Sequence, residues 1–341
     1  MRDRTSKRRG LVWVTAIGIV LAQVAACSSN DDGSSTAPST TAHASGPSSG
    51  CEATPVVAPG TTDRTITSGG VERTYRLEVP ASYDGTKPYA VVLGLHSLTV
   101  DYRIVPAMTG FADMASTYDF IGVAPSGRLD GSTPYWNAAP VPDNYDVAFL
   151  GELLDHLEAT LCVDTGRVFS TGMSNGAQMS SLLACRMPER VAAVAPVAGV
   201  EFLEPCDGAP VPVTAFHGSA DPILPYAGGG LNATTIADVQ FYKGRLPPEL
   251  PAPLGIDESM ASWAAHNNCD PDALEERVSP EVRKRTWTGC DAATELYIVD
   301  GGGHAWPGKP VPQFEAVFGH GTTEIDATSL IFSFFFDPPR S

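Results

Sequence analysis

The stretch Thr171-Gly172-Met173-Ser174-Asn175-Gly176-Ala177 decides the fold, and the rest of the chain is interpreted outward from it. Before it, residues 167–170 (R-V-F-S) have the β-branched and aromatic composition of a short buried strand. After it, residues 177–187 are rich in Ala, Leu and Met, which favour a helix. A strand that turns sharply into a helix through G-x-S-x-G raises the serine hydroxyl above the end of a sheet.

The glycines at positions 172 and 176 fit such a turn. The turn crowds the backbone, so a Cβ at either position would collide with the neighbouring strand or helix. The helix that follows directs its N-terminal N–H groups at any anion that forms at Ser174. The alternative is that Ser174 only caps this helix, which serine often does.

Strands and helices alternate along the rest of the chain. Apolar or alternating runs predict strands at residues 64–67, 71–79, 89–95, 120–124, 191–197, 211–216 and 295–299. Helix-favouring runs predict helices at residues 111–118, 144–161, 256–266 and 327–336. Residues 125–142 and 225–253 are expected to be loops. The alternation predicts one α/β domain, an α/β-hydrolase fold with a mostly parallel sheet flanked by helices.

The overall composition is that of an acidic globular protein. Among 341 residues, 43% are hydrophobic and the formal net charge is −17. The hydrophobic share is enough for a sizeable core. The negative charge excludes nucleic acid as a partner, because phosphates would be repelled.

The N-terminal region predicts export and a lipid anchor. A basic segment precedes an apolar run at residues 11–24, which is short for a membrane span and has the pattern of a secretory signal. The run ends in Val24-Ala25-Ala26-Cys27, as in a bacterial lipobox, so Cys27 is expected to carry lipid. The alternatives are an ordinary signal peptide and an N-terminal anchor helix.

The domain boundaries follow from this pattern. Residues 1–26 are expected to be a lipoprotein signal peptide, and residues 27–50, mostly Ser, Thr, Ala, Gly and Pro, a disordered tether. Residues 51–341 are expected to form the catalytic domain. The protein would then be held at the outer face of the cell membrane by its lipid alone.

The cysteines support export. Besides Cys27 the chain has six, at Cys51, Cys162, Cys185, Cys206, Cys269 and Cys290. An even number in an exported chain predicts three disulfides, whose pairing the spacing alone leaves open. A zinc site is the alternative, but no C-x-x-C spacing supports it.

The chain has candidates for the partners of a nucleophilic serine. A serine hydroxyl needs an imidazole to take its proton and a carboxylate to orient that imidazole, in the chain order Ser, Asp, His. Asp221 follows the strand at 211–216, although it could only cap the next turn. Asp257 and Asp300 are the competing acids. His304 follows the last strand after three glycines, which let the loop fold back over the sheet edge.

An oxyanion needs two backbone donors at such a site. The N–H of Asn175, next to the serine, is expected to be one. The other is expected from the loop that follows the third strand, His96-Ser97-Leu98, and we favour Leu98. The alternative is that this is an ordinary loop.

Together these residues resemble the polyhydroxybutyrate depolymerase and feruloyl esterase family of secreted α/β-hydrolases, most of all its actinobacterial lipoprotein members. The resemblance runs from about Cys51 to Ser333. Its most specific pieces are Cys162-Val163-Asp164, Arg167-Val168-Phe169, Gly172-Met173-Ser174-Asn175-Gly176, Ala195-Pro196-Val197-Ala198-Gly199, His217-Gly218 with Asp221, Pro225-Tyr226, Gly301-Gly302-Gly303-His304 and Trp306-Pro307-Gly308.

The resemblance implies a Ser174–Asp221–His304 triad. It also implies the disulfides Cys51–Cys162, Cys185–Cys206 and Cys269–Cys290. The implied substrates are carboxylic esters: hydroxyalkanoate oligomers, feruloyl or acetyl groups on sugars, or small aryl esters. Trp306 and Trp136 match positions near the family's cleft and would line the substrate site, although core packing is an equal alternative.

The chain departs from the family after the third strand. The family usually has His-Gly there, and this chain has His96-Ser97. Serine disfavours the positive φ that glycine adopts, so the oxyanion loop is expected to follow another path or to place its donor less well.

The sequence thus predicts a serine esterase that needs no metal or cofactor. Two other functions share these residues. A peptidase of the same fold would use every group named above. A catalytically silent cell-surface binding protein on a hydrolase fold is the second alternative, which the Ser97 departure keeps open.

Overall fold

The computed structural model describes residues 45–53, 56–229 and 254–337. The predicted signal peptide, Cys27 and most of the predicted loop at 225–253 lie outside these residues. Within the described part of the chain, no helix is long and apolar enough to cross a membrane.

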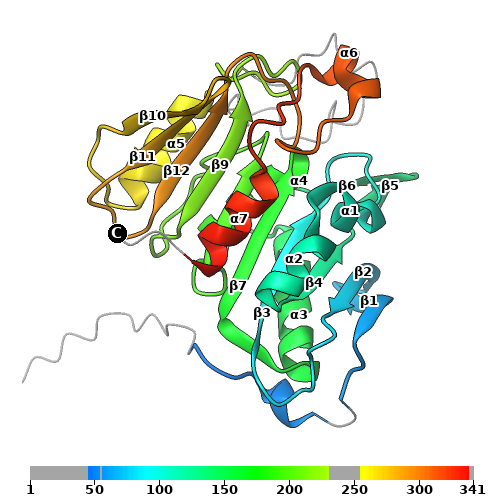
Figure 1. Cartoon of the computed structure of the whole chain (residues 1–341). Helices are drawn as coiled ribbons and strands as arrows, with labels where there is room; N and C mark the ends of the chain where they lie inside the picture. The colour runs from blue at the N-terminus through cyan, green and yellow to red at the C-terminus, as the bar shows by residue number, and fades with distance from the viewer. Residues whose placement is uncertain (1–44, 54–55, 230–253, 338–341) are drawn as a thin grey trace, which may run out of the picture. The chain divides into compact units, whose positions relative to one another are not determined.

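The described residues form a ten-stranded sheet in the order β1-β2-β4-β3-β7-β8-β9-β12-β11-β10 (Figure 1). The strands are β1 (Gly60–Ser68), β2 (Val71–Val79), β3 (Tyr89–Leu95), β4 (Ile121–Pro125), β7 (Val163–Met173), β8 (Ala193–Val197), β9 (Val213–Gly218), β10 (Leu274–Ser279), β11 (Val282–Trp287) and β12 (Thr294–Val299). The run from β4 to β12 is parallel, and antiparallel pairs extend it at both edges. The prediction of a mostly parallel sheet is confirmed.

Helices cover both faces of the sheet. They are α1 (Val105–Thr109), α2 (Phe111–Tyr118), α3 (Tyr145–Thr160), α4 (Asn175–Arg186), α5 (Ile256–His266), α6 (Glu315–Phe318) and α7 (Ala327–Phe336). One core lies under α3, α4 and α5, and a second core lies under α2 and α7. The sequence of strand β3 is apolar throughout because both of its faces are buried. Val91 and Leu93 pack in the first core, and Val92 packs in the second.

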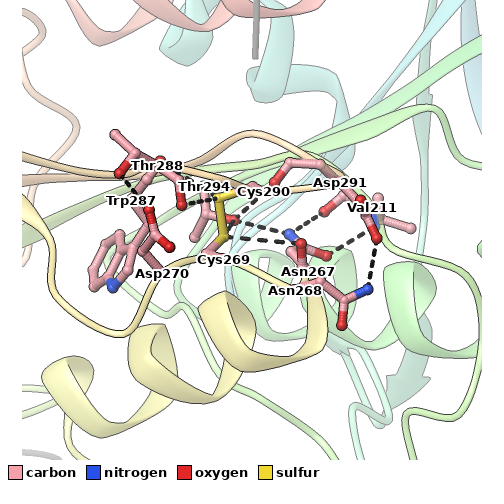
Figure 2. The surroundings of a disulfide bond; sticks show 11 residues. Val211, Asn267, Asn268, Cys269, Asp270, Trp287, Thr288, Cys290, Asp291 and Thr294 are labelled. Atoms are coloured by element: carbon pink, nitrogen blue, oxygen red, sulfur yellow. Dashed lines mark hydrogen bonds between the residues drawn. A yellow bond between two sulfur atoms is a disulfide. The ribbon is translucent and has the colours of Figure 1, made fainter.

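Three disulfides join the six cysteines in the pairs that the family resemblance implies. They are Cys51–Cys162, Cys185–Cys206 and Cys269–Cys290. Figure 2 shows the third, beside Asn267 at the end of α5. The Asn267 side chain exchanges two hydrogen bonds with the backbone of Val211 (3.1 and 2.9 Å), which hold the helix end against the segment that enters β9.

The structure also differs from the sequence-based assignment. Residues 125–142 contain a short hairpin, β5 (Arg128–Asp130) and β6 (Thr133–Tyr135), where a loop was expected. Strands β10 and β11 were not predicted. The ordered body also begins before Cys51, because the N–H of Ser48 donates to the carbonyl of Val163 at 2.8 Å.

Candidate active site

Ser174 lies at the sharp turn between β7 and α4. Its backbone has φ 58° and ψ −121°, a conformation that a serine holds only under strain. Its N–H donates to the carbonyl of Val197 at the end of β8 (2.9 Å), which fixes the turn against the next strand. The hydroxyl makes no capping hydrogen bond. The alternative that Ser174 serves as a helix cap is therefore wrong.

Gly172 and Gly176 have no room for a side chain. A Cβ on Gly172 would lie 2.7 Å from the carbonyl oxygen of Leu95, and a Cβ on Gly176 would lie 2.2 Å from the same oxygen. Both glycines mark the closest approach of the elbow to the end of β3. The expected crowding is confirmed.

Asp221 and His304 lie at the same edge of the sheet as Ser174. Asp221 follows β9 and His304 follows β12, and the strands β7, β8, β9 and β12 are parallel neighbours, so their carboxyl ends share one edge. The Nδ1–H of His304 donates to Oδ2 of Asp221 at 2.8 Å, and both side chains are buried. This bond leaves Nε2 of His304 as the ring nitrogen that can accept a proton.

The Asp221 carboxylate has two roles that the sequence presented as alternatives. Its Oδ1 accepts the N–H groups of Ile223 and Leu224 (2.8 and 2.9 Å), so it does cap the following turn. Its Oδ2 accepts from His304. Burial by itself raises the pKa of Asp221, but the hydrogen bond and charge of His304 outweigh it, and the net shift is downward. The carboxylate is therefore ionised at neutral pH.

The loop after β3 is tied directly to the elbow. The Ser97 hydroxyl donates to the carbonyl of Met173, the residue before Ser174, at 3.1 Å. The positive φ in this loop falls on Thr99 (67°) and not on Ser97, so the strain expected at Ser97 is absent. Among the described residues, none accepts a hydrogen bond from the N–H of Leu98 or of Asn175.

The Asn175 side chain fixes a second loop to the elbow. Its Oδ1 accepts the N–H of Trp136 (2.7 Å), and its Nδ2 donates to the carbonyl of the same residue (3.1 Å). The pair acts as a two-point clamp. It holds the loop that follows β6 against the start of α4.

The two tryptophans expected at the substrate site are core residues. Trp136 is 1% exposed and Trp306 is 2% exposed. The indole N–H of Trp136 donates to the carbonyl of His96 (3.1 Å), and that of Trp306 donates to the Thr328 hydroxyl (3.0 Å). The structure thus contradicts the expectation that these indoles line an open site. Their rings are buried in the core, and their N–H groups have hydrogen-bond partners inside the protein.

No family model matches the chain, but comparisons with known proteins find similar esterases. It is 29% identical over 289 residues to the putative esterase NocK of Nocardia uniformis subsp. tsuyamanensis, covering 79% of this chain and 80% of that protein. It is 28% identical over 240 residues to the probable feruloyl esterase C of Aspergillus niger (67% and 76% covered). It is also 33% identical over 178 residues to feruloyl esterase C of Emericella nidulans (48% and 60% covered). The chain is thus similar to esterases over most of its length, which supports a carboxylic ester hydrolase.

The fold agrees with that of a solved esterase. The acetyl xylan esterase from Aspergillus awamori superposes with a TM-score of 0.53 at 18% identity, covering 76% of this chain and 99% of that one. At this identity the likeness shows the shared α/β-hydrolase fold.

The competing acids of this esterase are engaged elsewhere. Asp300 pairs with Arg283 (2.7 Å) and Arg277 (3.0 Å), and Asp257 pairs with Arg285 (2.7 Å). Among the described residues, neither acid forms a hydrogen bond or an ion pair with a histidine, in contrast to Asp221. In the described residues, no group of three or more His, Cys, Asp or Glu side chains is placed to hold a metal ion.

Sequence reasoning missed a chain of polar side chains beside the elbow. The Asn175 Nδ2 lies 3.5 Å from Oε1 of Gln178, and the Gln178 Nε2 donates to Oε1 of Glu201 at 2.7 Å. No motif marks Glu201. The available signal was the place of Gln178 about one helical turn after the serine, which puts its side chain on the same side of α4.

Proposed function

We propose that this esterase hydrolyses carboxylic esters by attack of the Ser174 hydroxyl and formation of an acyl-enzyme. His304 takes the hydroxyl proton through Nε2, and Asp221 holds the imidazole in the tautomer that permits this. The N–H groups of Asn175 and Leu98 stabilise the oxyanion. His304 then protonates the departing alcohol and activates the water that releases the acid.

The observation that carries this proposal is the 2.8 Å bond between His304 and Asp221 at the sheet edge where the strained Ser174 turns into α4. Chain order, strand-end placement and the single free ring nitrogen all match the roles of a charge-relay set. The tie between Ser97 and Met173 supports the placement of the Leu98 N–H beside the elbow.

The ester class follows from the relatives. Proteins named feruloyl esterase and acetyl xylan esterase are similar to this chain. We therefore infer that its substrates are small or oligomeric esters, such as feruloyl or acetyl groups on sugars, hydroxyalkanoate oligomers, or small aryl esters. A panel of these esters under initial-rate conditions ranks them by kcat/KM.

A fluorophosphonate probe tests the nucleophile. The wild type is expected to carry one adduct on Ser174 by mass spectrometry. Ser174→Ala is expected to lose both labelling and turnover while its thermal melt is unchanged. Ser262→Ala, at a partly exposed serine on α5, is the matched control and should behave as the wild type. Retained turnover in Ser174→Ala would refute the assignment.

The same proteins and probe, with an added anilide substrate, distinguish the two alternative functions. Cleavage of a matched anilide at a rate comparable to that of the ester would indicate a peptidase. A folded wild type that neither binds the probe nor hydrolyses any ester would indicate a silent binding protein.

We also propose that the protein is exported and anchored by lipid on Cys27. The three disulfides support export, because such bonds persist in oxidising compartments. Metabolic labelling with palmitate should mark the full chain and not Cys27→Ser. Equal labelling of both proteins would refute the anchor.

A further inference from the structure

A small pocket lies beside the elbow, at the carboxyl ends of β8 and β9. Its walls come from the loop after β8, which includes Gly199 and Glu201, from His217 and Leu224 around the end of β9, and from Ile256 at the start of α5. The cavity is about 20 Å³, which gives room for about one water-sized group. In open α/β sheets, ligands bind at this edge.

The pocket adjoins the candidate nucleophile. A Cβ on Gly199 would lie 2.6 Å from the carbonyl oxygen of Ser174, so this wall is packed on the elbow. On the opposite side, Nε2 of His217 lies 3.4 Å from Oδ2 of Asp221. The pocket therefore touches both the serine turn and the acid that orients His304.

Glu201 offers an unused acceptor in this pocket. Its backbone is fixed by bonds to the Ser181 hydroxyl (3.3 Å) and from the Trp263 indole N–H (2.9 Å). One carboxyl oxygen accepts from Gln178, and the other accepts from none of the described residues. No cation in the described part of the chain pairs with it. Burial raises the pKa of Glu201 to about 7.

His217 offers a second unused acceptor. Its Nε2–H donates to the carbonyl of Leu224 at 2.9 Å, which makes Nδ1 the lone-pair nitrogen of a neutral ring. Burial lowers the pKa of His217 and keeps the ring neutral. The side chain is 1% exposed, and Nδ1 has no partner among the described residues. A buried acceptor without a donor costs free energy unless something supplies one.

We propose that the Glu201–His217 pocket is a subsite for a hydroxyl group carried by the ester substrate. Both polar atoms accept hydrogen bonds, the other walls are apolar or backbone, and the space admits about one such group. A hydroxyl supplies one hydrogen, which either of the two acceptors can take, whereas a methyl group supplies none. The inference rests on the proposed esterase function, since it concerns the substrate of that site.

Two matched ester pairs test the subsite. Methyl 3-hydroxybutyrate against methyl 3-methylbutanoate places the hydroxyl in the acyl part, and 2-hydroxyethyl butyrate against propyl butyrate places it in the alcohol part. In one pair, the wild type should favour the hydroxylated ester by about tenfold or more in kcat/KM, because unsatisfied polar groups penalise the analogue.

The variants assign the preference to Glu201. Glu201→Leu should abolish this preference, measured as the ratio of kcat/KM for the two esters of a pair, because a general loss of activity lowers both rates and cancels in the ratio. Glu201→Gln keeps the size of the side chain and one acceptor oxygen, so it should keep part of the preference for the hydroxylated ester. It replaces the leucine variant in the test if that variant does not fold. Glu258→Leu, at an exposed glutamate on α5, is the matched control.

The outcomes separate this inference from the esterase proposal. If the protein hydrolyses the plain esters and prefers neither hydroxylated ester, the subsite inference is wrong and the proposed esterase function stands. A preference that survives in Glu201→Leu would overturn it as well. Failure to hydrolyse any ester would instead overturn the proposed function.

Discussion

Replacing Glu201 with Gln is expected to stabilise the protein at pH 8 and to leave its stability nearly unchanged at pH 5. Burial raises the pKa of this carboxyl from 4.5 to about 7, so the folded protein holds the proton more tightly than the unfolded chain. The stability that the proton supplies is fully present below about pH 4.5 and is lost as the pH rises through about 7. Glutamine stays neutral at every pH, so the Glu201→Gln variant does not lose this stability as the pH rises.

The shift sets the size of the effect. This shift corresponds to at most about 3 kcal/mol in the free energy of unfolding. Water reaches part of the Glu201 side chain, which screens the charge, so about 1–2 kcal/mol is expected.

Urea unfolding with the disulfides intact measures this difference. Wild type, Glu201→Gln and the exposed control Glu258→Gln are compared at pH 5 and pH 8. Other groups titrate in all three proteins, so the difference between wild type and variant isolates one carboxyl. A Glu201→Gln effect of the same size at both pH values would show that the carboxyl is solvated like Glu258. It would also remove the physical basis for an acceptor held in the pocket.

Three further changes have defined outcomes. Asp221→Asn should lower kcat on an aryl ester by about 10⁴-fold, because the amide fixes the wrong tautomer of His304, and a loss below about tenfold would contradict the triad. Ser97→Ala should lower kcat about three- to tenfold, the worth of one hydrogen bond at the elbow, with an unchanged KM. Replacing Cys51 and Cys162 together by serine opens a link across 111 residues and should lower the unfolding free energy by about 5 kcal/mol, measured in urea.

The central strands and the positions of the candidate site residues could be predicted because one physical rule governs both. A parallel strand buried on two faces must be apolar along its length, so β3 and β9 stand out in the sequence. The loop residues just past such strands are then forced to one edge of the sheet. Asp221 and His304 were found by position, and the structure joins them at 2.8 Å.

The edge strands β10 and β11 could not be found this way. Residues in β10 are mostly exposed, so no apolar alternation marks the strand. The pairing is reinforced instead by charges across the two strands: Glu275 accepts from Arg283 (3.0 Å) and Arg285 (2.7 Å). Such ion pairs depend on register, and register is known only after the strands are paired.

The prediction that Trp136 and Trp306 line the substrate site was wrong for a different reason. A tryptophan near a loop with catalytic residues has the same sequence context whether its ring faces the substrate or the core. What decides is the partner of its indole N–H, and for Trp136 that partner is the carbonyl of His96, far away in sequence. Glu201 was missed for the converse reason, since a lone glutamate after a strand looks like an ordinary surface residue.

Hydrogen bonds around the elbow offset the strain of its serine. A serine held in the conformation of Ser174 costs about 1–3 kcal/mol, and each hydrogen bond to the turn contributes about 1 kcal/mol. The turn has a bond from Ser174 to β8, one from Ser97 to Met173, and the two-point clamp of Asn175. These bonds are sufficient to offset the strain. Ser97 itself has no positive φ, and its bond to Met173 ties the loop after β3 to the elbow, which in the proposed mechanism would hold the Leu98 N–H in position before the substrate arrives.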